Sequence, residues 1–305
     1  MNGTMTTSVI LSSYNGEKYI EEQLLSIRDQ TVPVGEVVIK DDCSTDSTVN
    51  IVKRFIADNN LLSWRLIVND SNLGWKRNFI EGMKLVSGDC IFLCDQDDIW
   101  MPTKVEEMLP VFDDSNVGLL VSDLIPFADD GSDAYVFHPV LGKGLVSKVD
   151  CDVHICDSRR PGCTYCFRRE LIGEIDKVWF EDWAHDFCLL TVAAAKGVLY
   201  SYNKPLIRFR RHAGTNTPSN EKTKLRRVEL LEFNLRIIDI ILSHAKDLDI
   251  PEENFKRLQG AQDFNQKRAE SIRKGSVFGF AGMLPYLSCY PKPSSFIGDM
   301  IASMK

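Results

Sequence analysis

The segment of this chain best equipped for chemistry is Asp95-Gln-Asp-Asp98, where three carboxylates fall within four positions. It follows Cys90-Ile-Phe-Leu-Cys94, an apolar run too short for an ordinary helix and typical of a strand buried on both faces. Side chains alternate along a strand, so a strand ending in Asp-x-Asp would place Asp95 and Asp97 on the same side. Two carboxylates that close repel unless a cation or a proton lies between them. Hard oxygen ligands suit Mg²⁺ or Mn²⁺, and either ion can hold a diphosphate.

A plainer interpretation of the same residues is an acidic turn that caps the next helix. Asp98, shortly before Pro102, fits that interpretation. Asp-x-Asp strings are also common by chance, so the segment alone does not establish a metal site. The elements that position it therefore matter.

Before this strand, three apolar runs alternate with turn-rich stretches and helical spacing. The expected strands are 8–11, 36–40, 64–68 and 90–94, and the helices between them carry the apolar sets Ile20/Leu24/Ile27, Ile51/Val52/Phe55/Ile56 and Phe79/Ile80/Met83. Repeated strand–helix units predict a parallel sheet covered by helices on both faces. Ligands bind such sheets at the carboxyl ends of the strands. Because those ends carry Tyr14-Asn15, Asp41-Asp42 and the acidic segment, we expect three polar clusters to converge on one rim.

The rest of the chain is less regular. Spacing predicts a helix over 105–112, a strand over 117–121, and insertions bordering the site from 122 to 161, with a loop tip at 129–133. A short helix over 168–175 and an apolar helix from about 181 to 195 follow, and then strands over 198–202 and 205–212. Two amphipathic helices, 221–245 and 252–274, precede an apolar tail that is too broken to span a bilayer.

Composition is that of a packed globular protein, with 44% hydrophobic and 26% charged residues. The net charge of −7 and the lack of a basic run make nucleic acid an unsuitable partner. The nine cysteines are odd in number, and most of them lie in apolar runs. That pattern indicates a reduced, cytoplasmic protein and not a disulfide scaffold. The polar start, Met1–Thr7, predicts no signal peptide.

In order and spacing, motifs between residues 6 and about 215 resemble the family-two inverting glycosyltransferases with a GT-A fold. They are Ser12-Ser-Tyr-Asn15, Ser26-Ile-x-x-Gln-Thr31, Asp41-Asp-x-Ser-x-Asp46, Leu73-Gly with Arg77-Asn78, and Gly88-Asp-x-Ile-x-x-x-Asp-Gln-Asp-Asp98. The form Asp-Gln-Asp-Asp-x-Trp-x-Pro-x-Lys104, with Arg211-His-x-Gly-x-Asn216, looks most like bacterial polysaccharide and O-antigen transferases, many of them rhamnosyltransferases. The resemblance implies an α/β fold with a Rossmann-like, mostly parallel central sheet flanked by helices, and a C-terminal helical extension.

The resemblance also implies a donor site for a nucleotide-activated sugar. Developing negative charge on the leaving diphosphate must be met by cations, and Asp95 and Asp97 are the expected ligands of Mg²⁺ or Mn²⁺. Arg77 contacts the diphosphate or the pocket carboxylates, against the alternative of a surface helix residue. His212 contacts the metal or the diphosphate. The other expected donor-site residues are Ser13, Tyr14 and Asn15 in the nucleotide pocket, Asp41 or Asp42 on the base or ribose, and Gln96 and Asp98 beside the metal.

Inversion needs a base opposite the departing diphosphate to take the proton of the acceptor hydroxyl. In the family this is a carboxylate at the start of a helix beyond the metal motif, and Asp186 is the residue we choose. Glu181 and Asp182 are close competitors. A plain role at a helix N-terminus is the alternative for all three.

Two features keep more than one interpretation. Cys151, Cys156, Cys163 and Cys166 include one Cys-x-x-Cys pair and allow a zinc cluster, although buried thiols are favoured because this stretch resembles the family's acceptor-side segment. The tail over 278–290 suits a peripheral contact with the inner face of the cell membrane, where lipid-linked acceptors reside. Its alternatives are a partner-binding helix or one that covers a core.

The sequence therefore predicts a GT-A domain over 1–218 and a helical extension over 219–305. Within the domain, residues 1–121 form the nucleotide-sugar half and 122–218 the acceptor half. The expected activity is metal-dependent, inverting transfer of a sugar, with dTDP-rhamnose as one donor, to a glycan or lipid-linked acceptor in cell-surface polysaccharide synthesis. The rival functions are a sugar nucleotidyltransferase, which normally has a Gly-rich basic loop after its first strand, and a non-catalytic nucleotide-sugar-binding protein.

Overall fold

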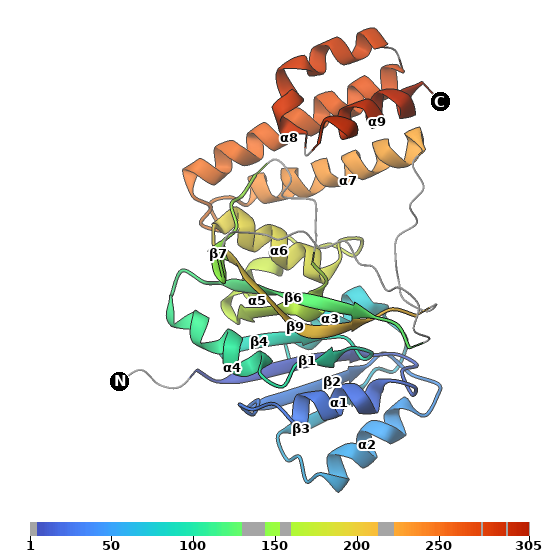
Figure 1. Cartoon of the computed structure of the whole chain (residues 1–305), viewed down its shortest axis with the longest axis vertical. Coiled ribbons are helices and arrows are strands. Elements are labelled where there is room, and N and C mark those ends of the chain that lie inside the picture. Colours follow the sequence, from blue (N-terminus) through green and yellow to red (C-terminus); the bar gives the residue numbers. More distant parts are fainter. Residues whose placement is uncertain are drawn as a thin grey trace. The chain divides into compact units, whose positions relative to one another are not determined.

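The computed structural model describes residues 5–129, 144–152, 160–212, 223–275, 277–290 and 292–304 (Figure 1). The chain forms two compact units. The first contains Met1–Val149, Ser158–Ala193 and Val198–Thr215, and the second contains Asp150–Asp157, Ala194–Gly197 and Asn216–Lys305. All expected donor-site, metal-site and base residues belong to the first unit. Of the four cysteines that allow a zinc cluster, Cys151 falls in the second unit and Cys156 lies outside the described residues.

The first unit begins with the predicted strand–helix repeats. In chain order these are β1 (Thr7–Ser13), α1 (Ile20–Arg28), β2 (Glu36–Asp41), α2 (Thr48–Asp58), β3 (Trp64–Val68), α3 (Trp75–Met83) and β4 (Cys90–Cys94). The four strands are parallel, in the order β3-β2-β1-β4. The strand order therefore reverses between β1 and β4, which is the point where ligands bind open α/β sheets.

The same sheet continues with strands from the second half of the unit, in the order β8-β6-β9-β5, and β7 pairs with β9. The elements are β5 (Ile99–Trp100), α4 (Lys104–Met108), η1 (Leu109–Asp113), β6 (Leu119–Phe127), β7 (Val146–Lys148), η2 (Gly162–Thr164), β8 (Tyr165–Arg168), α5 (Glu170–Ile175), α6 (His185–Lys196) and β9 (Leu199–Arg210). Because β8 runs antiparallel to β4 and to β6, it joins the two halves.

Alternating strand residues bury both faces of the sheet. On one face, Val9, Leu11, Val37 and Ile39 pack in a core to which α1, α2 and α4 contribute their apolar residues. On the other face α3 lies close, and a side chain at Gly82 would collide with Ile10. The mostly parallel sheet with helices on both faces is thus confirmed.

Three local expectations were wrong. Strand β4 spans Cys90–Cys94 as expected, but Asp95 and Asp97 lie beyond its end, so the strand alternation expected to align their side chains does not apply. The apolar helix α6 begins at His185 rather than near residue 181. One strand, β9, replaces the two expected over 198–202 and 205–212, because Pro205 is accommodated at a register shift of its pairing with β6. The expected loop tip at 129–133 falls almost entirely outside the described residues.

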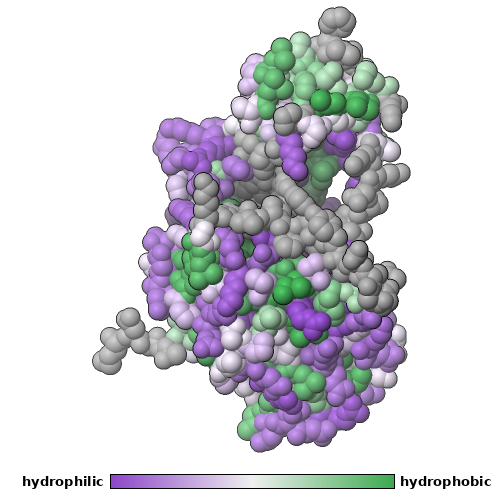
Figure 2. All heavy atoms as spheres, in the orientation of Figure 1, coloured by the Kyte–Doolittle hydropathy of each residue, from purple (hydrophilic) through white to green (hydrophobic). Residues whose placement is uncertain are grey.

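The second unit is helical, with α7 (Lys224–Ser243), α8 (Glu252–Lys274), η3 (Val277–Cys289) and α9 (Pro293–Ser303). Its core includes Phe264, Phe280 and Met283. Asp299 is fully buried and accepts hydrogen bonds from Arg227 and Arg268. Figure 2 shows hydrophobic residues gathered over this C-terminal part of the chain. In the described ranges, no helix combines the length and the apolarity that crossing a membrane requires.

Candidate active site

The loops that follow β1 and β2 are locked to each other by side chain to backbone hydrogen bonds. Asn15, with a positive φ of 48°, donates its N–H to the Ser44 hydroxyl (2.9 Å) and accepts from the Thr45 N–H (2.8 Å). The Gly16 N–H donates to the Thr48 hydroxyl (2.8 Å). Asparagine tolerates the left-handed conformation better than most residues, and here that conformation turns its side chain onto the neighbouring loop.

Gln96 ties the first of these loops to the acidic turn. Its side-chain oxygen accepts from the Tyr14 N–H (2.8 Å), and its side-chain nitrogen donates to the Tyr14 carbonyl (3.0 Å). A Cβ at Gly16 would collide with the Gln96 amide, so only glycine permits this approach. Tyr14 itself keeps an exposed ring. The carboxyl ends of β1 and β4 are therefore joined across the switch point.

Asp41 and Asp42 are buried and already carry protein donors. Asp41 is 0% exposed and accepts from the Ser13 hydroxyl (2.8 Å) and from both the N–H and the hydroxyl of Ser44 (2.8 and 2.6 Å). Asp42 accepts from the Asn69 amide (2.8 Å) and from the backbone N–H groups of residues 73 and 74 (2.7 and 2.8 Å). These bonds fix the loops, and they leave each carboxylate little capacity to bind a nucleotide.

The acidic segment forms a turn between β4 and β5, so strand alternation does not govern its side chains. Asp97 Oδ2 lies 2.8 Å from His212 Nε2, and both side chains are partly exposed, at 21% and 25%. The turn therefore pairs Asp97 with a histidine that follows β9, instead of aligning it with Asp95. A carboxylate oxygen and an imidazole nitrogen side by side are ligand types that suit Mn²⁺.

Arg210, the last residue of β9, holds the turn in place. It is 4% exposed, its backbone N–H donates to Asp98 Oδ1 (2.9 Å), and its Nε donates to the Asp97 carbonyl (2.7 Å). Its remaining guanidinium nitrogens pair with Glu22 and Asp129. Two carboxylates and one carbonyl thus meet at one buried guanidinium, which suits its planar fork of donors.

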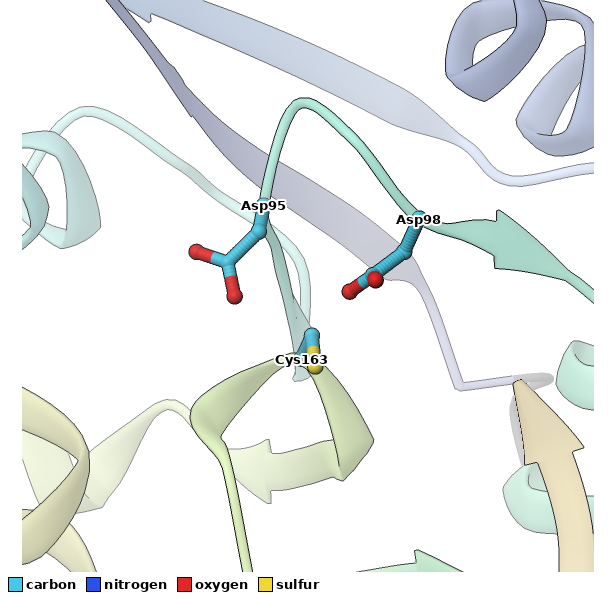
Figure 3. Close-up of side chains that lie close together, drawn as sticks. All are labelled: Asp95, Asp98 and Cys163. Atoms are coloured by element: carbon cyan, nitrogen blue, oxygen red, sulfur yellow. The ribbon is translucent and has the colours of Figure 1, made fainter. Parts of the chain in front are cut away.

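Asp95, Asp98 and Cys163 form a second cluster, in which one ligand atom from each lies within 4.8 Å of the others. Figure 3 shows the two carboxylates at opposite ends of the turn and Cys163 on η2, with the Asp98 carboxylate directed into the space they share. Asp98 is 1% exposed, and its Oδ2 has no hydrogen-bond partner among the described residues. Burial first, and then the charge of Asp97, raises the pKa of Asp98 to about 7. Burial and the Asp98 charge likewise raise the pKa of Asp95.

A divalent cation fits this turn, because the turn carries more negative charge than the surrounding hydrogen-bond donors compensate. Asp97 and His212 offer partly exposed oxygen and nitrogen ligands, and Asp95 adds a third group at the same turn. Asp98 is enclosed and serves less well as a direct ligand. Cys163 is a soft ligand that neither Mg²⁺ nor Mn²⁺ prefers.

Asp186, the expected base, lies in the first turn of α6 and faces the acidic turn. Its charge contributes to the raised pKa of Asp95, which means that the two carboxylates are close enough to repel. Asp186 Oδ2 accepts from the Gly162 N–H (3.2 Å), and Oδ1 accepts from the Phe187 N–H (2.7 Å). A Cβ at Gly162 would lie 2.9 Å from the Asp186 Cβ, so η2 packs directly on the base-bearing helix.

Glu181, a competing base, is occupied by Arg77. Two guanidinium nitrogens of Arg77 donate to the same carboxylate oxygen, with Nη2 2.5 Å and Nε 3.1 Å from Glu181 Oε2. The hydrogen bond from Arg77 lowers the pKa of Glu181, which weakens it as a proton acceptor. Arg77 is thus directed to Glu181, and no contact of its guanidinium with Asp95, Asp97 or Asp98 occurs among the described residues. The Asp182 carbonyl accepts from Lys76 (2.8 Å), so both residues before α6 are tied to α3.

His185, next to Asp186, is buried between aromatic rings. It stacks on Phe79 with ring centroids 4.0 Å apart and meets Trp75 edge-on at 5.6 Å. Burial lowers its pKa to about 4, so the ring is neutral at physiological pH. The neutral His185 ring, packed between Phe79 and Trp75, therefore fixes the start of α6 against α3.

Most of the expected residues converge at this rim, and the sequence interpretation missed three that organise it. Ser13, Tyr14, Asn15, Asp41, Gln96 and Asp97 belong to interlocked loops, whereas Arg77 points to Glu181. The missed residues are Arg210, Lys104 and Gly162. For Arg210 and Lys104 the sequence offered a signal, since each is a charged residue inside an apolar or motif-rich stretch. The tight approach at Gly162 has no sequence signal of its own.

The fold defines a class first: an α/β sheet of the GT-A type, with the acidic turn at the switch point of the strand order. The chain matches Glycosyl transferase family 2 over residues 8–147. It is 30% identical over 242 residues to the dTDP-rhamnosyl transferase RfbG of Shigella flexneri, covering 72% of this chain and 78% of that protein. The chain belongs to glycosyltransferase family 2.

Other similarities are more local. Over 96 residues the chain is 41% identical to the poly(ribitol-phosphate) beta-N-acetylglucosaminyltransferase TarS of Staphylococcus aureus, spanning 31% of this chain and 16% of TarS. A TarS crystal structure (residues 1–349) matches 98% of this chain and 81% of that chain at 20% identity, with a TM-score of 0.61. The mannosyltransferase PcManGT of Pyrobaculum calidifontis, in complex with GDP-Man and Mn²⁺, matches 99% of this chain and 87% of that one at 17% identity, with a TM-score of 0.56. These two structures support the fold.

Proposed function

We propose that this chain is a metal-dependent, inverting glycosyltransferase that moves a sugar from a nucleoside diphosphate sugar to a glycan or lipid-linked acceptor in cell-surface polysaccharide synthesis. The observation that carries the proposal is the meeting of Asp97 and His212 at the sheet's switch point, 2.8 Å apart, with Asp186 in Coulombic range of the same turn. The similarity to RfbG supports dTDP-rhamnose as the first donor to test. Family membership favours transfer over nucleotidyl transfer or binding alone.

In this proposal residues 1–121 bind the donor and 122–218 bind the acceptor. The interlocked loops around Tyr14 and Asn15 shape the nucleotide pocket, and Asp41 and Asp42 keep those loops in place. Asp95, Asp97 and His212 would hold Mg²⁺ or Mn²⁺, and the cation would supply positive charge against the departing diphosphate. Arg210 keeps the turn from relaxing when a ligand enters.

Asp186 acts as the general base. Its carboxylate accepts the proton of the acceptor hydroxyl while that oxygen attacks the anomeric carbon on the face opposite the leaving diphosphate. One displacement of this kind inverts the anomeric configuration. The bonds from Gly162 and Phe187 aim the carboxylate, and the Arg77 ion pair removes Glu181 from competition.

A donor screen tests the proposal. Thermal unfolding is followed with dTDP-rhamnose, UDP-GlcNAc and GDP-mannose, each with and without MnCl₂, because a ligand that binds the folded state raises Tm by mass action. We expect one donor to raise Tm only with the metal, and the same donor to release its nucleoside diphosphate when the protein is added. NMR of the sugar formed during early turnover should show the inverted anomer. A retained anomer, or turnover that is unaffected by EDTA, would contradict the proposal.

A further inference from the structure

Lys104 is a fully buried lysine that the proposed chemistry does not use. It is the first residue of α4, is 0% exposed, and its Nζ lies 4.2 Å from the centre of the Trp100 ring. Burial lowers its pKa, although nearby acidic groups, Cys163 first and later Asp98, oppose that effect. A lysine without exposed surface is rare, because removing an ammonium group from water is costly. A methionine of similar length would fill the same space without that cost.

The Lys104 ammonium holds the turn that touches the candidate base. Its Nζ donates to the Cys163 carbonyl at 2.6 Å, in the middle of η2. The neighbouring Gly162 N–H donates to Asp186 Oδ2, and the missing side chain at Gly162 lets η2 lie against α6. A shift of η2 would therefore shift the donor that aims the Asp186 carboxylate.

The same ammonium also contacts the strand that follows the acidic turn. Its Nζ lies over the ring of Trp100, and Trp100 belongs to β5, which begins directly after Asp98. Arg210 holds that turn from the other side, with its backbone N–H on Asp98 and its Nε on the Asp97 carbonyl. Lys104 thus contacts η2 through a hydrogen bond and the strand after the acidic turn through the Trp100 ring.

We propose that Lys104 is a positioning residue that fixes the base Asp186 relative to the acidic turn by anchoring η2. This inference rests on the proposed function, since it concerns the rate of the same transfer. It does not involve contact between Lys104 and substrate, because the side chain has no exposed surface. Loss of the anchor should lower turnover while leaving donor binding nearly intact.

The test compares Lys104→Met with a matched control, Lys196→Met. Lys196, in the second unit, also donates its ammonium to a backbone carbonyl, that of Leu248. Turnover is measured as nucleoside diphosphate release from the donor chosen by the screen above, and binding as the Kd of the corresponding nucleoside diphosphate with Mn²⁺. We expect Lys104→Met to lower kcat about 10- to 100-fold with KM and Kd within about threefold of wild type, because sub-ångström to ångström displacements of catalytic groups have effects of this size. Lys196→Met should keep wild-type kcat.

Several outcomes overturn the inference. A Lys104→Met variant that folds and keeps more than half of the wild-type kcat removes the positioning role. Equal losses in kcat and in nucleotide affinity would show a general structural role instead. If Lys104→Met does not fold, Lys104→Gln, which is neutral and shorter, is measured against the same thresholds for kcat and Kd. Wild-type protein that binds no nucleotide and turns over no donor would contradict the proposed function itself, whatever the variants do.

Discussion

Two pairs of neighbouring aspartates stand at the carboxyl ends of strands in the same sheet, and they are treated in opposite ways. Asp41 and Asp42, after β2, accept six hydrogen bonds between them from side chains and backbone. Asp97 and Asp98, after β4, face one histidine and one backbone N–H among the residues that the structure describes, and Asp98 Oδ2 has no hydrogen-bond partner there. Carboxylates whose hydrogen-bond donors are all supplied by the protein stabilise the loops. Carboxylates with few hydrogen-bond donors can bind a cation instead.

Burial alone does not make this distinction. Asp299 in the second unit is as buried as Asp98, yet two arginines neutralise it. What sets the acidic turn apart is the excess of negative charge over nearby hydrogen-bond donors. Burial first, and then the charge of Asp97, raises the pKa of Asp98 to about 7. Substitutions should therefore act differently on the two pairs: on metal-dependent turnover at Asp97, and on stability at Asp42.

Asp97→Ala should lower metal-dependent turnover of the donor by a factor of about 1,000 or more, because it removes a metal ligand and the partner of His212. Tm should stay the same or rise, since one of several mutually repelling carboxylates is lost. Asp58→Ala, at the end of helix α2, is the control and should behave as wild type. Turnover retained by Asp97→Ala would reject the metal assignment.

Asp186→Asn should reduce transfer by roughly 100- to 1,000-fold while nucleotide affinity is preserved, because an amide cannot accept the proton but keeps the shape of the side chain. Steady-state kinetics and a nucleotide titration measure the two quantities. Glu181→Gln is the matched variant and should cost far less, since Glu181 is engaged by Arg77. A near-normal rate for Asp186→Asn would move the base to Glu181 or Asp182.

Asp42→Ala should act on stability rather than on chemistry. It leaves three donors in the loop region without their acceptor, and each unsatisfied buried group costs about 1–3 kcal/mol, so we expect a loss of about 2–4 kcal/mol in the free energy of unfolding. Urea unfolding measures the loss. If the variant were as stable as wild type but inactive, Asp42 would act in the chemistry, as Asp97 is proposed to do, and not in holding the loops.

His185→Leu should change how stability depends on pH. Burial lowers the folded-state pKa of His185 to about 4, so the unfolded chain binds a proton below pH ~6.5 that the folded chain does not. That difference makes stability fall as pH decreases. Between pH 7.5 and 5 the wild type should lose about 2 kcal/mol more than the leucine variant. Parallel stability curves for the two proteins would contradict a buried, neutral His185.

The sequence predicted the parallel half of the sheet well, because Val9–Leu11, Val37–Ile39 and the run at Cys90 are apolar on both faces and turns separate them. It also predicted which polar loops share a rim, since parallel strands end at the same edge. It did not predict how the side chains of the turn after Cys94 are arranged, because Arg210, more than a hundred residues later in the chain, holds that turn through Asp97 and Asp98. For the same reason the pairing of Asp97 with His212, and of Arg77 with Glu181, could not come from spacing.

The anchor at Lys104 shows the same limit. Its position in the Asp-Gln-Asp-Asp-x-Trp-x-Pro-x-Lys motif was visible, but its role depends on a turn formed by residues 162–164. Contacts between distant segments decide which member of a motif binds ligand and which supports it. Local patterns specify the elements, and tertiary contacts assign the roles.

A Mn²⁺ titration followed by electron paramagnetic resonance, in the presence of dTDP, UDP or GDP, tests directly whether the acidic turn holds the cation. The wild type should bind Mn²⁺ together with one of these nucleotides, and Asp97→Ala and His212→Ala should each weaken that binding at least about 30-fold. Asp41→Asn changes a carboxylate that accepts its hydrogen bonds from the protein, so the folded variant should bind Mn²⁺ and nucleotide like wild type. Unchanged Mn²⁺ binding by Asp97→Ala would contradict the central claim that the acidic turn holds the cation.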